Sequence, residues 1–393
     1  MKIIGIDDEE GKRKDINPKK ILIEIIVGAI VVITIILAIL YATSKPFRNF
    51  MDKYVLMKNV MENAVNSIQI EESQSNAVYA YDKYICVLSQ NKLKGYNSAG
   101  KQEYELEVEI TNPIVDTNNR FLLIAEKEKQ KIYLIEGNSI KWEKELEGNI
   151  SRVSVNKNGY VSVILTGTTY KSIVQTIDAS GNKMFKTYLS SNLAVDSDIS
   201  NDNKYLSFAE ISTNGTILQS MIKTVAIQEE QETRTISSLT SPSEGIILNL
   251  KYQDGNRLVC MYDNSIHVIQ NGTDEVLLDI NEQKQKVTFA DAELTNYAYR
   301  IIEKSSLLNT QSSVEIINTS TKKINTYELD GTVKEVYAYN EKIALNIGSE
   351  VHFIGINGWL NKKYISTQEV RNIVIANNFA GIVYRDKIEI VEL

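Results

Sequence analysis

Two cysteines and two histidines are the residues best suited to metal binding or nucleophilic chemistry, and the sequence scatters all four. Cys86 and Cys260 lie within the apolar runs YICVL and LVCMY, which is typical of small buried hydrophobic side chains. His267 and His352 occupy the segments SIHVIQ and EVHFIG, where we expect core or edge histidines rather than ligands. No Cys or His pair has zinc-site spacing, and the sequence contains neither a nucleophile elbow nor a Walker loop. We therefore predict neither a catalytic residue nor a metal ligand.

Acidic side chains form the second group with possible chemistry. Those between residues 196 and 203 superficially resemble a calcium loop: Asp196, Asp198, Asn201, Asp202 and Asn203. The segment lacks the glycine and the terminal bidentate glutamate at the required spacing, so a solvated turn is predicted. We expect no cofactor. A glycan hydrolase would need two carboxylates that converge within about 5–10 Å, at least one with a raised pKa, and only a folded ring could supply that geometry.

Composition excludes several classes of protein. The 393 residues carry 43 Lys and Arg against 50 Asp and Glu, and no basic block occurs beyond the N-terminal tail, so a nucleic-acid partner is not expected. Two cysteines in so long a chain exclude a disulfide framework. With 21 Tyr, only 4 Pro and frequent Ile and Val, the chain suits half-buried β-strands.

A transmembrane helix is predicted for residues 21–42, which read ILIEIIVGAIVVITIILAILYA. At about 1.5 Å per residue this run is long enough for a bilayer core. Its only charge, Glu24, lies one turn from the start, where the headgroups can accommodate it. A cleaved signal peptide is the competing interpretation, but its apolar region would be shorter and would end in a small-x-small site. We expect an uncleaved anchor that holds the protein to the lipid bilayer.

Positive charges predict the orientation of this helix. The tail of residues 1–20 carries six Lys and Arg, more than the stretch after the helix, so the tail is predicted to be cytoplasmic. Residues 43–393 would then be extracytoplasmic, at the plasma membrane. Apolar residues at helical spacing predict an amphipathic stalk over residues 43–66: Phe47, Phe50, Met51, Tyr54, Met61 and Val65. Its apolar stripe could pack on the following domain, lie on the bilayer, or dock a partner.

A module of about forty residues recurs eight times beyond the stalk. Each copy has an extended strand, a polar turn and a strongly apolar second strand. Asn, Asp and Gly in the turns accept the positive φ that tight hairpins require. The turn markers step by 37 to 53 residues: Asp82, Asn119, Asn158, Asp202, Gly255, Asn296, Asn340 and Asn378. This is the period of a four-stranded propeller blade.

The second half of each module supports the same architecture. A third strand is followed by a turn and a polar fourth strand, and in several copies an aromatic residue follows the turn. Tyr104, Trp142 and Phe185 have this position, and we expect them to dock between adjacent blades.

These turns and strands resemble those of bacterial β-propellers of the quinoprotein-like and WD40-like kinds. SNDNKYLSF (200–208) and YQDGNRLV (252–259) are similar to degenerate forms of the Ser-Pro-Asp-Gly-Lys turn of such repeats. The arrangement as a whole resembles single-pass membrane proteins of clostridia and related Firmicutes that have a propeller ectodomain. The resemblance implies an all-β propeller over residues 67–393 and no particular activity.

Ring closure can also be argued from the sequence. The last module supplies three strands before the chain ends, and residues 67–73 can provide the fourth. An unpaired edge would invite aggregation. Eight blades are predicted, and seven remain possible because the step between Asp202 and Gly255 is irregular.

The leading functional hypothesis is a non-catalytic binding or scaffolding module for an envelope protein, peptide or glycan. It depends on the large closed surface, the tether and the lack of a catalytic motif. Two alternatives stay open: an exported glycan hydrolase or lyase, and a ligand-sensing ectodomain.

Overall fold

The computed structural model describes residues 18–44, 47, 50–51, 55, 61–62, 66–212, 218–227, 235–240, 245–280, 286–305 and 310–393. The chain divides into two compact units, Met1–Val60 and Met61–Leu393.

The first unit contains one long helix, α1 (Pro18–Thr43), which includes the predicted span of residues 21–42. Proline suits the first helical position because its missing N–H has no partner there in any case. Residues Ile26–Thr43 are apolar, and none of them is buried by other parts of the protein. This helix is therefore long and apolar enough to cross a membrane, a property that membrane anchors and signal sequences share.

The predicted stalk helix lies mostly outside the described residues. At its C-terminal end the helical prediction is wrong, because Met61 and Glu62 form a short strand, β1 (Met61–Glu62). The strand pairs in parallel with β30 (Leu360–Ile365), so its backbone groups bond to a sheet and not along a helix.

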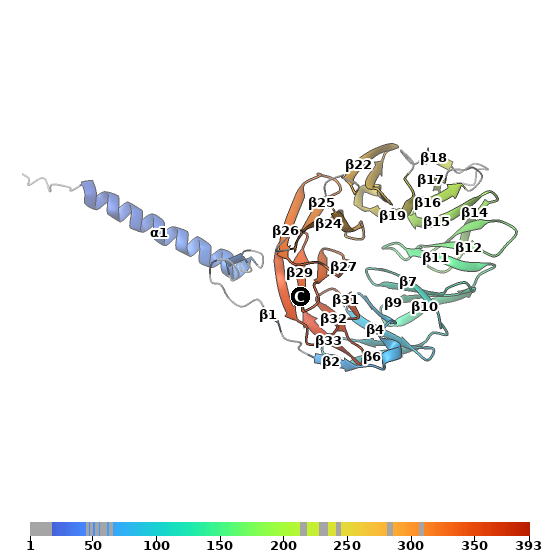
Figure 1. Cartoon of the computed structure of the whole chain (residues 1–393), viewed down its shortest axis with the longest axis horizontal. Helices are drawn as coiled ribbons and strands as arrows, with labels where there is room; N and C mark the ends of the chain where they lie inside the picture. The colour runs from blue at the N-terminus through green and yellow to red at the C-terminus, as the bar shows by residue number, and fades with distance from the viewer. Residues whose placement is uncertain are drawn as a thin grey trace, which may run out of the picture. The chain divides into compact units, whose positions relative to one another are not determined.

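The second unit is an eight-bladed β-propeller of four-stranded antiparallel sheets. Figure 1 shows these sheets arranged in a ring. This confirms the predicted fold and decides for eight blades against seven. Blades 1 to 4 comprise β3 (Val78–Tyr81), β4 (Tyr84–Ser89), β5 (Lys92–Tyr96), β6 (Gln102–Glu107); β7 (Pro113–Asn118), β8 (Phe121–Glu126), β9 (Lys131–Glu136), β10 (Ser139–Glu145); β11 (Asn149–Val155), β12 (Val161–Thr166), β13 (Ser172–Ile177), β14 (Lys183–Leu189); and β15 (Asn192–Ile199), β16 (Tyr205–Ser212), β17 (Gln219–Ala226), β18 (Thr235–Thr240).

Blades 5 to 8 repeat this order, with the first strand innermost in each sheet. They comprise β19 (Ile247–Gln253), β20 (Arg257–Tyr262), β21 (Ser265–Gln270), β22 (Thr273–Asp279); β23 (Lys286–Asp291), β24 (Tyr297–Ser305), β25 (Thr310–Asn318), β26 (Ile324–Asp330); β27 (Glu335–Tyr339), β28 (Lys342–Asn346), β29 (Glu350–Gly355), β30; and β31 (Asn372–Ile375), β32 (Phe379–Val383), β33 (Lys387–Glu392) with β2 (Asn66–Gln69).

The burial of each strand follows its place in the blade. In β8 all six residues, FLLIAE, are buried, because a second strand has neighbouring blades on both of its faces. In the outer strand β10 burial alternates, and Trp142 is the buried residue at its centre. Apolar runs and alternating segments thus mark inner and outer strands of the same sheet.

Positive φ angles occur at the predicted turns, although not always at the expected residue. Asp82, Asn119, Asn296 and Asn340 have φ between 47° and 60°. After the markers Asn158 and Asp202 it is the next residue, Gly159 or Asn203, that has the positive φ. Gly255 also has a positive φ (72°), so the prediction is confirmed in seven blades, with a shift of one residue in two of them. In blade 8 it is wrong, because neither Asn377 nor Asn378 has a positive φ.

The ring closes through β2, which pairs antiparallel with β33 from Asn66 opposite Ile390 to Gln69 opposite Lys387. It forms the outermost strand of blade 8. The strand is shorter than the predicted segment of residues 67–73, because a 3-10 turn, Glu72–Gln74, follows it. Since β1 adds to the outer edge of blade 7, the N-terminal end of this unit contacts the outer edges of two successive blades.

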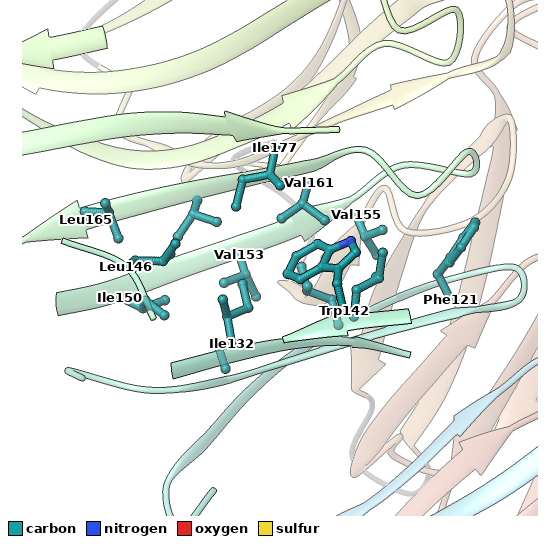
Figure 2. Packing of buried hydrophobic residues seen from close by; sticks show 14 of the residues in the cluster. Phe121, Ile132, Trp142, Leu146, Ile150, Val153, Val155, Val161, Leu165 and Ile177 are labelled. Atoms are coloured by element: carbon teal, nitrogen blue, oxygen red, sulfur yellow. The ribbon is translucent and has the colours of Figure 1, made fainter. Parts of the chain in front are cut away.

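Hydrophobic clusters lie between successive blades. Figure 2 shows the cluster of blades 2 and 3, in which Phe121, Ile132 and Trp142 of blade 2 meet side chains of blade 3. Its blade 3 members include Ile150, Val153, Val161, Leu165 and Ile177. The core is therefore a series of blade junctions around a central channel.

Candidate functional site

The three aromatic residues singled out in the sequence all lie at blade junctions. Trp142 is 8% exposed, and its indole ring packs on Gly181 of blade 3. A Cβ added to Gly181 would lie 3.0 Å from Cγ of Trp142. Tyr104 is buried, with its hydroxyl oxygen 2.5 Å from that of Tyr81, which in turn donates to the Gly137 carbonyl of blade 2 (2.5 Å). Phe185 is half-buried against the cluster between blades 3 and 4.

Hydrogen bonds between neighbouring turns run around the whole ring. Each turn that joins a first and second strand, or the end of the strand before it, bonds to the next blade. In blade order the donors and acceptors are Asp82 N to Asn119 O (3.0 Å), Asn118 Nδ2 to Val155 O (3.1 Å), Asn158 Nδ2 to Asn201 O (2.9 Å), Asn256 Nδ2 to Asp202 Oδ2 (2.9 Å), Asp254 N to Asn296 Oδ1 (3.1 Å), Thr295 N to Asn340 O (2.8 Å), Lys342 Nζ to Asn377 O, and Asn377 N to Asp82 O (2.9 Å).

This closed ring explains why Asn and Asp recur in the turns. Their side chains stabilise each turn and bridge to the next one, so turn chemistry and ring closure use the same groups. Asp202 and Asn201, from the segment that resembles a calcium loop, belong to the ring. Among the described residues, no group of three His, Cys, Asp or Glu side chains is arranged to hold a metal ion.

The second candidate site is the central channel, which the inner strands of the blades surround. Its half beside the turn ring has a volume of about 350 Å³, and the half toward the opposite face about 660 Å³. Asp116, Thr117, Glu293, Ala338 and Tyr339 line both halves. They mark the level at which the two halves join into one channel.

Carboxylates of the inner strands accept hydrogen bonds from neighbouring blades, and one of them, Asp116, also lines the channel. Asp116 of β7 accepts the Val155 N–H of blade 3 (2.7 Å). Asp198 of β15 accepts the Tyr252 N–H (2.7 Å), and Asp196 accepts the Leu250 N–H (2.9 Å), both of blade 5. The channel side of an innermost strand is an unpaired sheet edge, whose N–H groups need acceptors. These aspartates supply acceptors from the preceding blade.

Burial disfavours the charged form of these aspartates. It raises the pKa of Asp198 to about 7 and that of Asp196 and of Asp291 to about 6, and it also raises the pKa of Asp116. Hydrogen bonds to backbone N–H groups act in the opposite direction and are outweighed. Three of these carboxyl groups, Asp196, Asp198 and Asp291, thus have pKa values close to neutral pH.

Two ion pairs lie among the described residues of the channel, Lys157 with Asp254 (3.2 Å) and Lys251 with Glu293. Lys251 Nζ is 2.5 Å from Glu293 Oε2, and the two side chains are 27% and 42% exposed to the channel. The positive charge of Lys251 lowers the pKa of Glu293. Burial opposes the charge of Lys251, but Glu293 and Asp116 outweigh it and raise the pKa of that lysine.

The opposite wall of the channel is aromatic and apolar. Tyr79 of blade 1, Tyr337 and Tyr339 of blade 7 and Ile373 of blade 8 line it. Burial raises the pKa of Tyr79 to about 12, so its phenol stays neutral. The channel thus has an acidic wall from blades 2, 5 and 6 and a neutral, partly aromatic wall from blades 7, 8 and 1.

Both histidines lie at the same position of a third strand and have both ring nitrogens bonded. In blade 5, His267 Nε2 is 3.0 Å from Ser265 Oγ and Nδ1 is 2.9 Å from Asp274 Oδ1. In blade 7, His352 Nε2 is 3.0 Å from Glu350 Oε2 and Nδ1 is 2.9 Å from the Tyr327 hydroxyl.

Our sequence analysis missed the Ser–His–Asp contact of blade 5. The available signal was Ser265 two residues before His267, since alternate residues of a strand share a face. Asp274 gave no such signal, because its position opposite Ile269 depends on the hairpin register.

A family model described as a family of unknown function (DUF5711) matches residues 59–393, which include the whole propeller. The chain belongs to this family. No curated protein sequence matches the chain significantly.

Two solved structures share the fold of this DUF5711 propeller. BamB from Moraxella catarrhalis is 12% identical with a TM-score of 0.50, over 84% of this chain and 99% of that one. The C-terminal WD40 domain of Sif2 is 13% identical with a TM-score of 0.54, over 85% and 96%. At such identities the likeness concerns the fold alone.

Proposed function

We propose that this protein is a binding module, held at a membrane by α1, whose central channel binds a cationic group of an envelope protein or peptide without catalysing a reaction there. The observation that carries the proposal is the asymmetry of the channel. Carboxylates line one wall and tyrosines the other, and a cation is attracted both by carboxylates and by the face of a tyrosine ring.

The charge balance of the channel favours a cation over an anion. In and around it are the carboxylates of Asp116, Asp196, Asp198, Asp254, Asp291 and Glu293, against the cationic groups of Arg152, Lys157 and Lys251. Arg152 acts on Asp196, while Lys157 and Lys251 pair with Asp254 and Glu293. With every group ionised an excess of three negative charges remains, which a bound lysine or arginine side chain would reduce.

The exported-hydrolase alternative has one observation in its favour, the raised pKa values of Asp196, Asp198 and Asp291. A general acid must however deliver its proton to a substrate. Asp198 accepts bonds from the Ser154 hydroxyl (2.7 Å) and from the N–H groups of Ile199 (2.9 Å) and Tyr252 (2.7 Å). Its oxygens are occupied by the blades, so we propose a structural and electrostatic role for it.

Substitution of one channel carboxylate tests the proposal. With the full chain in detergent, tetralysine is expected to bind, and Glu293→Gln is expected to weaken this binding about tenfold, since each 1.4 kcal/mol changes affinity by that factor. Isothermal titration calorimetry measures both affinities.

The matched control is Glu147→Gln, because Glu147 also pairs with lysines but far from the channel. It follows the outer strand of blade 2 and contacts Lys183 and Lys186 on the outer strand of blade 3. Its affinity for tetralysine should equal that of the unsubstituted chain. An equal loss of affinity for tetralysine in both variants would contradict a channel site for cations. So would binding of acetylated tetralysine with the same affinity as tetralysine.

Binding should also depend on pH. Asp196, Asp198 and Asp291, with pKa values raised to about 6 to 7, are protonated at pH 5 and ionised at pH 8. A cation binds the ionised forms more tightly, so the affinity for tetralysine is expected to rise between pH 5 and 8. Calorimetry at several pH values measures it, and affinity that falls over this range would rule out these groups.

The membrane placement has its own test. The full chain is expected to remain in the membrane fraction during alkaline extraction, and the chain without residues 1–43 is not. For orientation, Ala99→Cys places a thiol in an exposed turn, while Cys86 and Cys260 are fully buried and provide a low background. If the propeller is extracytoplasmic, an impermeant maleimide labels Ala99→Cys in intact cells. Labelling only after lysis would place the propeller inside.

A further inference from the structure

Blade 5 contains a hydrogen-bonded chain of the kind that activates a serine. Ser265 Oγ lies 3.0 Å from His267 Nε2, and Asp274 Oδ1 lies 2.9 Å from Nδ1 of the same ring. Both distances are within the range for a nucleophile, its base and the group that orients the base. Ser265 is half-buried at the start of β21, next to the exposed Asp263, whereas His267 is buried behind it.

The positions of the protons follow from the partners. A carboxylate only accepts, so Asp274 requires the proton of a neutral His267 on Nδ1. Nε2 is then an acceptor, and Ser265 must donate its one proton to it. Asn264 Oδ1 lies 2.9 Å from Ser265 Oγ. Because the one proton of Ser265 goes to Nε2, we infer that the Asn264 amide is turned by 180° during the reaction, so that its NH₂ group donates to Oγ.

The resulting chain runs from Asn264 through Ser265 and His267 to Asp274. It leaves one lone pair of Ser265 Oγ free to attack while the histidine takes up the hydroxyl proton. Blade 7 lacks this arrangement at the same strand position, since Glu350 stands where blade 5 has Ser265. At this strand position the histidine thus requires a polar partner, but the partner need not be a hydroxyl.

We propose that Ser265 is an activated nucleophile that accepts an acyl group from a small ester, an activity separate from binding in the channel. Ser265 Oγ bonds to the carbonyl carbon and passes its proton to His267 Nε2. The Asn264 amide donates to the developing oxyanion. As the ester C–O bond breaks, the leaving alkoxide takes the proton from Nε2. Water repeats the sequence and releases the acid.

Diisopropyl fluorophosphate tests the nucleophile without a known substrate, because Oγ displaces fluoride from phosphorus by the same proton transfer. Intact and peptide mass spectrometry of the full chain should find one adduct, on Ser265. The adduct should be absent in Ser265→Ala and form at least about tenfold more slowly in Asp274→Asn. The absence of an adduct on Ser265, or a rate unchanged by Asp274→Asn, would overturn the proposal.

A cysteine at position 265 gives a second measurement, which does not depend on the folding of Ser265→Ala or Asp274→Asn. In Ser265→Cys, His267 should promote the thiolate, so iodoacetamide is expected to react about tenfold faster than with the exposed Ala99→Cys at pH 7. The buried Cys86 and Cys260 contribute little background. A rate equal to or below that of Ala99→Cys would show that the histidine only fills the blade junction.

Discussion

The chain that begins at residue 71 is expected to lose its stable propeller, whereas the chain that begins at residue 61 is expected to keep it. The shorter chain lacks β2, the outer strand of blade 8. Ile68 of this strand is 4% exposed and packs with Val78, Ile85 and Ile390, so its loss costs about 2–5 kcal/mol by analogy with core truncations. The loss also leaves the edge of β33 unpaired and open to aggregation.

Thermal unfolding followed by circular dichroism measures the effect. A loss of about 5 kcal/mol should lower the melting temperature by about 7 °C in a domain of this size. Two point variants separate the side chain from the backbone: Ile68→Ala should be destabilised by about 2–4 kcal/mol, and Ser67→Ala, at an exposed position of the same strand, by less than about 0.5 kcal/mol. Equal melting of the two truncated chains would mean that β2 does not close the ring.

The fold was predictable because its signals are local and repeat eight times. Residues such as Asp82 and Asn119 mark tight turns by their own backbone preferences, and neighbouring apolar runs mark the second strands. Trp142 and Tyr104 could be assigned to blade junctions because large aromatic residues in outer strands need a covering surface. One weak signal in each copy becomes a strong prediction when eight copies occur in phase.

The channel and the blade 5 contact were not predictable because they depend on residues far apart in the chain. Asp116 meets Val155, and Asp198 meets Tyr252, only after the inner strands are placed around a ring. The raised pKa values come from that burial and leave no trace in the local sequence. Strand β1 escaped prediction for a related reason, since two residues carry no periodicity, and its pairing partner is some 300 residues away.

Gly358→Ala is expected to be strongly destabilising, by at least about 3 kcal/mol, because two costs combine. The turn between β29 and β30 gives Gly358 a φ of +74°, where a side chain is strained. A Cβ at this position would also lie 2.6 Å from the Thr326 carbonyl oxygen and 3.1 Å from its carbonyl carbon. Thr326 belongs to β26 of blade 6, so backbone meets backbone, and only separation of the two blades would relieve the clash.

Comparison with Gly272→Ala separates the cost of the clash from the cost of the backbone strain. Gly272 occupies the corresponding turn of blade 5 with a φ of +78°, but no atom of another residue lies within 4 Å of its Cβ position. It therefore shares the backbone strain, about 1 kcal/mol, without the clash. Urea unfolding should give a difference of about 2 kcal/mol or more between the variants, and equal stabilities would mean that blades 6 and 7 do not approach this closely. Gly100 and Gly181 have the same turn position and also lie against the outer strand of the preceding blade, at 3.5 Å and 3.0 Å. The expected cost of an alanine thus rises from Gly272 through Gly100 and Gly181 to Gly358, as the approach of the preceding blade becomes closer.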